Sequence, residues 1–128
     1  MAENKPSVNE SPATAPNTGD EPYDVIIIGA GAAGLGVAIA VMHTGIENYL
    51  IVDRHEVGAS FAAWPAETRF ITPSFPSNSI GMLDLNSIAI GISPAFNMRL
   101  EHPTGQEFAS HLQGIADFFE LPVRENTD

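Results

Sequence analysis

The sequence predicts an α/β protein with a parallel sheet, and three observations from residues 23–53 support this fold class. An apolar, mostly β-branched run, Val25–Ile28, leads into a turn that carries three glycines. A stretch of helical length without proline follows at Ala32–His43, and a second apolar run ends on Asp53. A strand, a helix and a strand in this order predict two parallel strands joined by a crossover helix.

The first strand and its turn have the pattern of a Rossmann-like phosphate-binding unit. Val25–Ile28 is typical of a short strand buried on both faces of a parallel sheet. Gly29 permits the tight turn, Gly31 lets the backbone approach a pyrophosphate, and Gly34 lets the helix pack closely on the strand. Amide groups at the helix start would face the anion, with the positive end of the helix dipole behind them. The alternative is an ordinary turn that serves only helix packing.

The helix and the second strand complete the unit. Ala32–His43 is apolar on all sides, which indicates a helix buried between layers, and it is too short to span a bilayer. Gly45 fits a helix C-cap, and 48–52 forms the next strand. Asp53 follows the turn by about 20 residues, where this fold places a carboxylate that binds an adenosine ribose. Otherwise Asp53 is a solvated acid or a cap, but the whole pattern favours dinucleotide binding.

Residues 54–103 differ from the rest, because five prolines interrupt any helical period. We expect a long loop with short elements of its own that wraps a ligand. Aromatic side chains are concentrated there: Phe61, Trp64, Phe70, Phe75 and Phe96. They either line an extended cofactor or form a hydrophobic cluster under the loop, and the sequence leaves both readings open.

Regular structure returns at Thr104, which forms a capping box with Glu107. An apolar stripe then recurs at helical spacing and should dock on the sheet: Phe108, Leu112, Ile115 and Phe119. Residues 121–124 start a third strand. We expect the free edge of that strand and the apolar face of this helix to lack partners in the chain alone, which favours association or aggregation.

Composition divides the chain into a disordered tail, 1–22, and a dinucleotide-binding domain, 23–128. The tail is rich in Pro, Asn, Ser, Thr and Glu, and it lacks the basic start and apolar core of a signal peptide. No run of about 18 apolar residues occurs without a turn signal, so we expect a cytoplasmic protein without a membrane partner.

Charge and residue usage restrict the function further. The net charge is −11 and the basic residues are scattered, so nucleic acid is not an expected partner. The absence of cysteine excludes a disulfide framework and a thiolate metal site. The four histidines have no metal-ligand spacing, and we expect each of them to be a surface or cap residue and no metal to bind.

From residue 22 to 128 the chain resembles the amino-terminal part of two-dinucleotide-domain flavoproteins, which include thioredoxin-reductase-like enzymes and flavin-containing monooxygenases. The resemblance rests on the glycine turn within 23–36, on the strand that ends at Asp53, on a 58–64 segment similar to the family's GGxW loop, and on 102–107 before a helix. It implies an incomplete FAD-binding domain and FAD as the cofactor.

The resemblance also implies roles for individual residues. The FAD pyrophosphate would meet the turn and the helix start: Gly29, Ala30, Gly31, Ala32, Ala33 and Gly34. Asp53 would bind the ribose and Arg54 would lie on the adenine side, while Ser60 and Trp64 would lie towards the flavin. The family more often has Glu in place of Asp53, and Ala59 and Ser60 replace part of its glycine pair. A second GxGxxG for NAD(P)H is absent, so NAD(P)H is expected only through a missing second half.

Three functions follow, of which we favour the first. In that function the chain is the FAD-binding part of an NAD(P)H-dependent flavoprotein oxidoreductase or monooxygenase and is inactive alone, being either truncated or completed by a second polypeptide or a homo-oligomer. The first alternative is the NAD-binding domain of a dehydrogenase, although the Tyr-x-x-x-Lys pair of short-chain enzymes is absent because Lys5 is the only lysine. The second alternative is a non-catalytic interaction module. No residue is assigned as catalytic, because the flavin carries the chemistry in this class.

Overall fold

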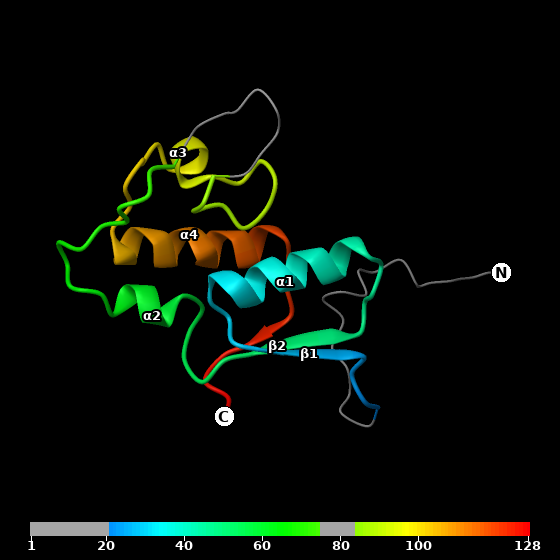
Figure 1. The fold of residues 1–128 in the computed structure, drawn as a ribbon. Helices are drawn as coiled ribbons and strands as arrows, with labels where there is room; N and C mark the ends of the chain where they lie inside the picture. The colour runs from blue at the N-terminus through cyan, green and yellow to red at the C-terminus, as the bar shows by residue number, and fades with distance from the viewer. Residues whose placement is uncertain (1–20, 75–83) are drawn as a thin grey trace.

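The computed structural model describes residues 21–74 and 84–128. The elements in chain order are β1 (Val25–Ile28), α1 (Ala32–His43), β2 (Tyr49–Val52), α2 (Ala59–Ala62), α3 (Pro94–Asn97), α4 (Gly105–Phe118) and β3 (Val123–Arg124). The strands form one parallel sheet in the order β1-β2-β3, and α1 and α4 lie over the same face of it (Figure 1). This arrangement confirms the predicted Rossmann-like fold.

The sheet is in register over the whole length of β1. Val25 pairs with Tyr49 and Ile28 with Val52, while β3 pairs with the end of β2 from Ile51 opposite Val123. Crossovers between parallel strands are almost always right-handed. Two crossovers that both step in the direction from β1 to β3 therefore place their helices on one face of the sheet, which is where α1 and α4 lie.

The core lies between this face of the sheet and the helices. Its largest members are Ile27, Leu35, Ile39, Tyr49, Ile51, Val57, Phe108, Leu112 and Ile115. Phe108 is 2% exposed and Leu112 is 0% exposed, because α2 and α1 contact α4 and its apolar stripe shares one core cluster with residues of β1 and β2. The expectation that this stripe would lack a partner is therefore wrong, whereas the expectation that it docks on the sheet is confirmed.

The opposite face of the sheet has no such cover within the described residues. Ile28 is 82% exposed and Ile26 is 53% exposed, so the predicted burial of β1 on both faces is wrong. Val37 on the outer side of α1 is 52% exposed, so this helix is covered on one side only and does not lie between two layers. Both errors have the same cause. A strand and a helix that are apolar throughout indicate that a layer of structure covers each of their two sides, and the described residues supply such a layer on one side only.

The ends of the helices are close to those predicted. Thr104 Oγ1 accepts from the Glu107 amide at 3.1 Å, and Glu107 Oε1 accepts from the Thr104 amide at 2.9 Å, so the capping box is confirmed. Thr44 is the C-cap of α1, and Gly45 follows it with φ +89°. The third strand starts two residues later than expected, at Val123.

The predicted tail, 1–22, lies outside the described residues except for Glu21 and Pro22, and Phe75 lies outside them too. The carbonyl of Pro22 accepts from Asn48 Nδ2 at 2.9 Å, so the described chain is already tied to the sheet there. Among the described helices, none combines the length and the apolar character that a membrane span requires.

His111 corrects the expectation that all histidines are surface or cap residues. It is 7% exposed on α4, and its Nε2 has no hydrogen-bond partner among the described residues. Burial lowers the pKa of this imidazole, and the nearby Asp84 carboxylate opposes the shift. A cavity of about 390 Å³ adjoins it between α4 and the region of α3. Within 21–74 and 84–128, no group of three or more His, Asp or Glu could hold a metal ion.

Candidate dinucleotide site

The glycine turn after β1 adopts a conformation that requires two of its glycines. Gly29 has φ +112°, a backbone conformation that side chains disfavour, and its amide donates to the Val52 carbonyl at 2.7 Å. A Cβ atom on Gly34 would lie 1.8 Å from the Gly29 carbonyl oxygen. A hydrogen is the only side chain that fits there, because the first turn of α1 passes directly over the end of β1.

Gly31 differs from these two glycines, because the space that a side chain there would occupy is open among the described residues. A Cβ atom there would meet no atom within 4 Å, and φ is −90°, which other residues also adopt. No side chain caps α1, and its first turn carries no acidic residue. The turn therefore presents uncapped helix amides and an open approach, and this arrangement fits a pyrophosphate at the positive end of a helix.

Asp53, at the end of β2, contacts the turn directly. Its Oδ2 accepts from the Ala30 amide at 2.6 Å, and its Oδ1 accepts from the His55 amide at 2.7 Å. An ionised carboxylate offers about four lone-pair sites, so each oxygen can still accept from a ribose hydroxyl. The structure thus brings the predicted acid and the predicted turn together and adds a contact that the sequence analysis missed.

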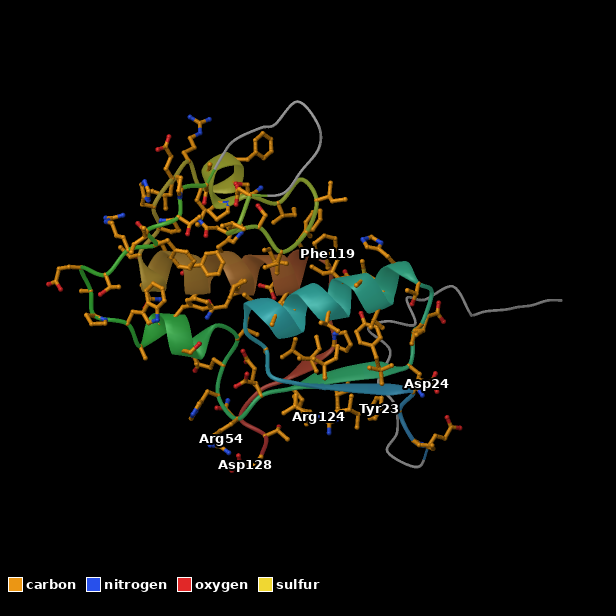
Figure 2. The ribbon with its side chains drawn as sticks, viewed as in Figure 1. Tyr23, Asp24, Arg54, Phe119, Arg124 and Asp128 are labelled. Carbon is orange, nitrogen blue, oxygen red and sulfur yellow. The ribbon has the colours of Figure 1, made fainter. Side chains whose placement is uncertain are left out.

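A cavity of about 310 Å³ opens at the carboxyl ends of β1 and β2. It is lined by Ile28, Gly29, Val52, Asp53, Arg54, Thr127 and Asp128. Arg54 Nε donates to Asp128 Oδ1 at 2.9 Å, and Figure 2 shows the two side chains beside each other at this end of the sheet. Thr127 and Asp128 were not predicted as site residues. The carboxyl ends of parallel strands nevertheless share one edge of the sheet, which is where open α/β sheets bind ligands.

Ser60 and Trp64 lie in and after α2, the segment that follows this cavity. The Gly58 amide donates to the Ala30 carbonyl at 3.1 Å, so the start of the segment is tied to the glycine turn. Ser60 is exposed on α2. The Trp64 ring packs on Phe61 at 5.3 Å and on Phe70 at 5.2 Å between ring centroids.

These rings settle part of the question that the aromatic residues raised. Phe70 lies 4.6 Å from Phe108 between centroids, so Phe61, Trp64 and Phe70 form one hydrophobic cluster on α4. Gly105 allows this contact, because a Cβ atom there would lie 2.1 Å from the Phe61 carbonyl oxygen. Phe96 stands apart and is 64% exposed.

A parallel strand-helix-strand unit with this turn and this acid defines a Rossmann-like fold. The family model described as pyridine nucleotide-disulphide oxidoreductase matches residues 26–128, and the chain belongs to this family.

Individual relatives agree with this assignment. The chain is 33% identical over 70 residues to an FAD-dependent urate hydroxylase of Xanthomonas campestris pv. campestris, which is 55% of this chain and 13% of that protein. The fold is similar to bacillithiol disulfide reductase from Staphylococcus aureus, with a TM-score of 0.61, 21% identity and coverage of 81% of this chain and 28% of that chain. The enzyme from Bacillus cereus gives a TM-score of 0.58 at 22% identity, with coverage of 80% and 28%. The resemblance inferred from the sequence is thus confirmed, and the chain spans less than a third of each relative.

Proposed function

We propose that this chain is the FAD-binding part of an NAD(P)H-dependent flavoprotein oxidoreductase or monooxygenase and is inactive alone. The observation that carries the proposal is the open approach at Gly31 beside uncapped helix amides, with the Asp53 carboxylate against the same turn. Family membership and the similarity to an FAD-dependent hydroxylase support FAD as the dinucleotide.

The proposed contacts follow the fold. The turn and helix start, Gly29 to Gly34, hold the pyrophosphate through backbone amides. Asp53 accepts from the ribose hydroxyls, and Arg54 borders the adenine side of the 310 Å³ cavity. Bound flavin would accept the hydride and pass on its electrons, and the residues of this chain would bind and orient it.

Ser60 and Trp64 are proposed for the flavin side of the site. The hydrogen bond from Gly58 to Ala30 supports this placement, because it fixes the start of their segment beside the turn. Packing against Phe61 and Phe70 then limits how far Trp64 can move.

Reduction of the flavin by NAD(P)H is proposed to need residues beyond those that the structure describes. The chain covers 28% of the structurally similar reductases, and it holds a single GxGxxG turn. A further polypeptide, either a second subunit or another part of a longer protein, would supply the nicotinamide site. A homo-oligomer is the alternative, and co-purification of the chain with its partner distinguishes the two.

Ligand titration tests the proposal. The purified chain, alone and with a second half taken from a relative, is titrated with FAD, ADP and NAD by calorimetry. We expect saturable FAD binding that ADP competes for. Binding of NAD without FAD would favour the NAD-binding domain of a dehydrogenase, and binding of none of the three in either preparation would favour the non-catalytic module.

A further inference from the structure

We infer that Glu125 is a positioning residue for the dinucleotide turn. Its carboxylate fixes the Val57 amide, and through Val57 it holds the 53–58 loop in place against Ala30. The inference rests on the proposed function, because the turn is the proposed pyrophosphate site. Glu125 follows β3 and lines neither of the two cavities described above.

The first of these contacts is at Val57, which is 4% exposed. Its amide donates to Glu125 Oε2 at 2.9 Å, and its carbonyl accepts from Gln113 Nε2 at 3.1 Å. Both polar groups of this buried peptide position are therefore held by side chains, one from the segment after β3 and one from α4. Such groups are seldom left without partners in folded proteins.

The next contacts lead to the turn. The Gly58 amide donates to the Ala30 carbonyl at 3.1 Å, and the Ala30 amide donates to Asp53 Oδ2 at 2.6 Å. Ala30 is thus held on both sides by the 53–58 loop. Gly58 has φ +74°, and a Cβ atom there would lie 3.0 Å from Ala109 Cα, so the loop has little room to shift towards α4.

Backbone hydrogen bonds separate the role of the Glu125 side chain from the general attachment of the loop. The Thr127 amide donates to the Asp53 carbonyl at 2.8 Å, and the Asn126 amide donates to the His55 carbonyl at 3.2 Å. These two bonds do not depend on the side chain at position 125. Loss of the carboxylate should therefore leave the loop attached at Asp53 and His55 but release its far end at Val57 and Gly58, which contacts the turn through the Ala30 carbonyl.

Two substitutions at position 125 in the full chain test this assignment. Glu125→Ala removes the acceptor, and we expect ADP affinity to fall on the order of fivefold or more, because the buried Val57 amide loses its partner. Glu125→Gln keeps an acceptor oxygen, and its affinity should stay within about twofold of the wild type. Glu67→Ala is the matched control, because it removes the same charge from an exposed loop position.

Amide hydrogen exchange, measured without ligand, reports the mechanism itself. In Glu125→Ala the amides of Ala30 and Gly58 should exchange faster, while those of β2 should keep wild-type protection. A purely structural role would instead speed exchange throughout the sheet. If Glu125→Ala melts too low to measure, Gln113→Ala releases the other side of Val57, and we expect the same local exchange at Gly58.

The outcomes are distinguishable. Wild-type ADP affinity and wild-type amide exchange in Glu125→Ala would overturn the inference. Equal losses of ADP affinity in Glu125→Ala and Glu125→Gln would overturn it too, because the charge would then matter and the hydrogen bond would not. A wild-type chain that binds neither ADP nor FAD would refute the proposed function. In that case the exchange of Ala30 still decides whether Glu125 braces the turn.

Discussion

The Asp53 carboxylate and the Ala30 amide are joined by a hydrogen bond of 2.6 Å, so the acid at the end of β2 holds the turn at the end of β1. Its other oxygen accepts from the His55 amide at 2.7 Å. Asp53 therefore has a structural contact in addition to its proposed contact with the ribose. A substitution there should affect the shape of the turn and the binding of the nucleotide together.

The first prediction concerns Asp53→Ala, which removes both effects. We expect ADP affinity to fall by about tenfold or more, which corresponds to roughly 1.4 kcal/mol. Asp53→Asn keeps one acceptor oxygen and should lie between this variant and the wild type. Calorimetric titration measures the affinities, with Asp117→Ala on the exposed side of α4 as the control. Unchanged affinity in Asp53→Ala would remove Asp53 from the site.

The second prediction concerns the 2′ position of the adenosine. Two carboxylates, Asp53 and Asp128, line the cavity with one guanidinium, Arg54, whose Nε is already 2.9 Å from Asp128 Oδ1. A ribose hydroxyl can donate to a carboxylate, whereas a 2′-phosphate would be repelled. ADP should therefore bind more tightly than 2′-phospho-ADP in competition with FAD. A preference for the phosphorylated nucleotide would contradict the proposed adenosine site.

The third prediction compares Gly31→Val with Gly34→Val. At Gly31 a side chain meets no protein atom within 4 Å, so the fold should melt close to the wild type while FAD and ADP binding is lost. At Gly34 a Cβ atom would lie 1.8 Å from the Gly29 oxygen, so the melting temperature itself should fall. Thermal melts and titrations of both variants measure the difference.

The result that matters is the affinity of the Gly31 variant. If Gly31→Val kept its affinity within about threefold of the wild type, a change under roughly 0.7 kcal/mol, the turn would not be the phosphate site.

The fourth prediction is a pH dependence of stability that comes from His111. Burial lowers its pKa below the ordinary value of 6.5, so the unfolded chain binds this proton more readily than the folded chain. Stability should therefore be full above pH 6.5 and fall as the pH drops below it, by at most about 1.4 kcal/mol per pH unit. His111→Leu should reduce the difference between the melting temperatures at pH 7.5 and 5.5.

The control for this prediction is His43→Gln, because His43 is exposed at the end of α1. The two histidine variants carry the same carboxylates, so a comparison between them isolates the buried imidazole. Equal pH dependence in wild type and His111→Leu would show that His111 does not contribute to it.

The fifth prediction is that the chain alone is poorly stable and binds FAD weakly. Ile28 and Ile26 expose apolar surface on the sheet, and β3 consists of two residues. Addition of a second half from a relative should raise the melting temperature and the retained flavin, because it covers this surface. A monomeric chain with a sharp melt and stoichiometric FAD would show instead that the domain is self-sufficient.

Local signals in the sequence predicted the parts of the fold that they determine. β1, α1 and the capping box of α4 occur at the predicted residues, because glycine spacing, helical length and a Thr104–Glu107 pair act over a few positions. The contacts of Asp53 with Ala30 and of Val57 with Glu125 depend on how distant segments meet, so no short pattern contains them.

The same reasoning explains the errors about burial. An apolar side chain indicates that some cover is expected, but it does not indicate which polypeptide supplies it. The sequence therefore predicted two covered faces at Ile28, and the described residues cover one. His111 was missed for the opposite reason, since an isolated histidine gives no sign that Asp84 and the region of α3 will lie beside it.

The direction of the two crossovers limits what this chain can bind. In an open α/β sheet the ligand crevice forms where neighbouring crossovers depart to opposite faces. Within the described part of the chain, β1 has a neighbouring strand on one side only. The described residues therefore form one side of that crevice, where the glycine turn and Asp53 are proposed to hold an adenosine diphosphate. The opposite side would have to come from a strand added beside β1. Until it is added, ADP and FAD should bind with similar affinity, because the isoalloxazine ring would extend past the edge of the sheet with little to rest on.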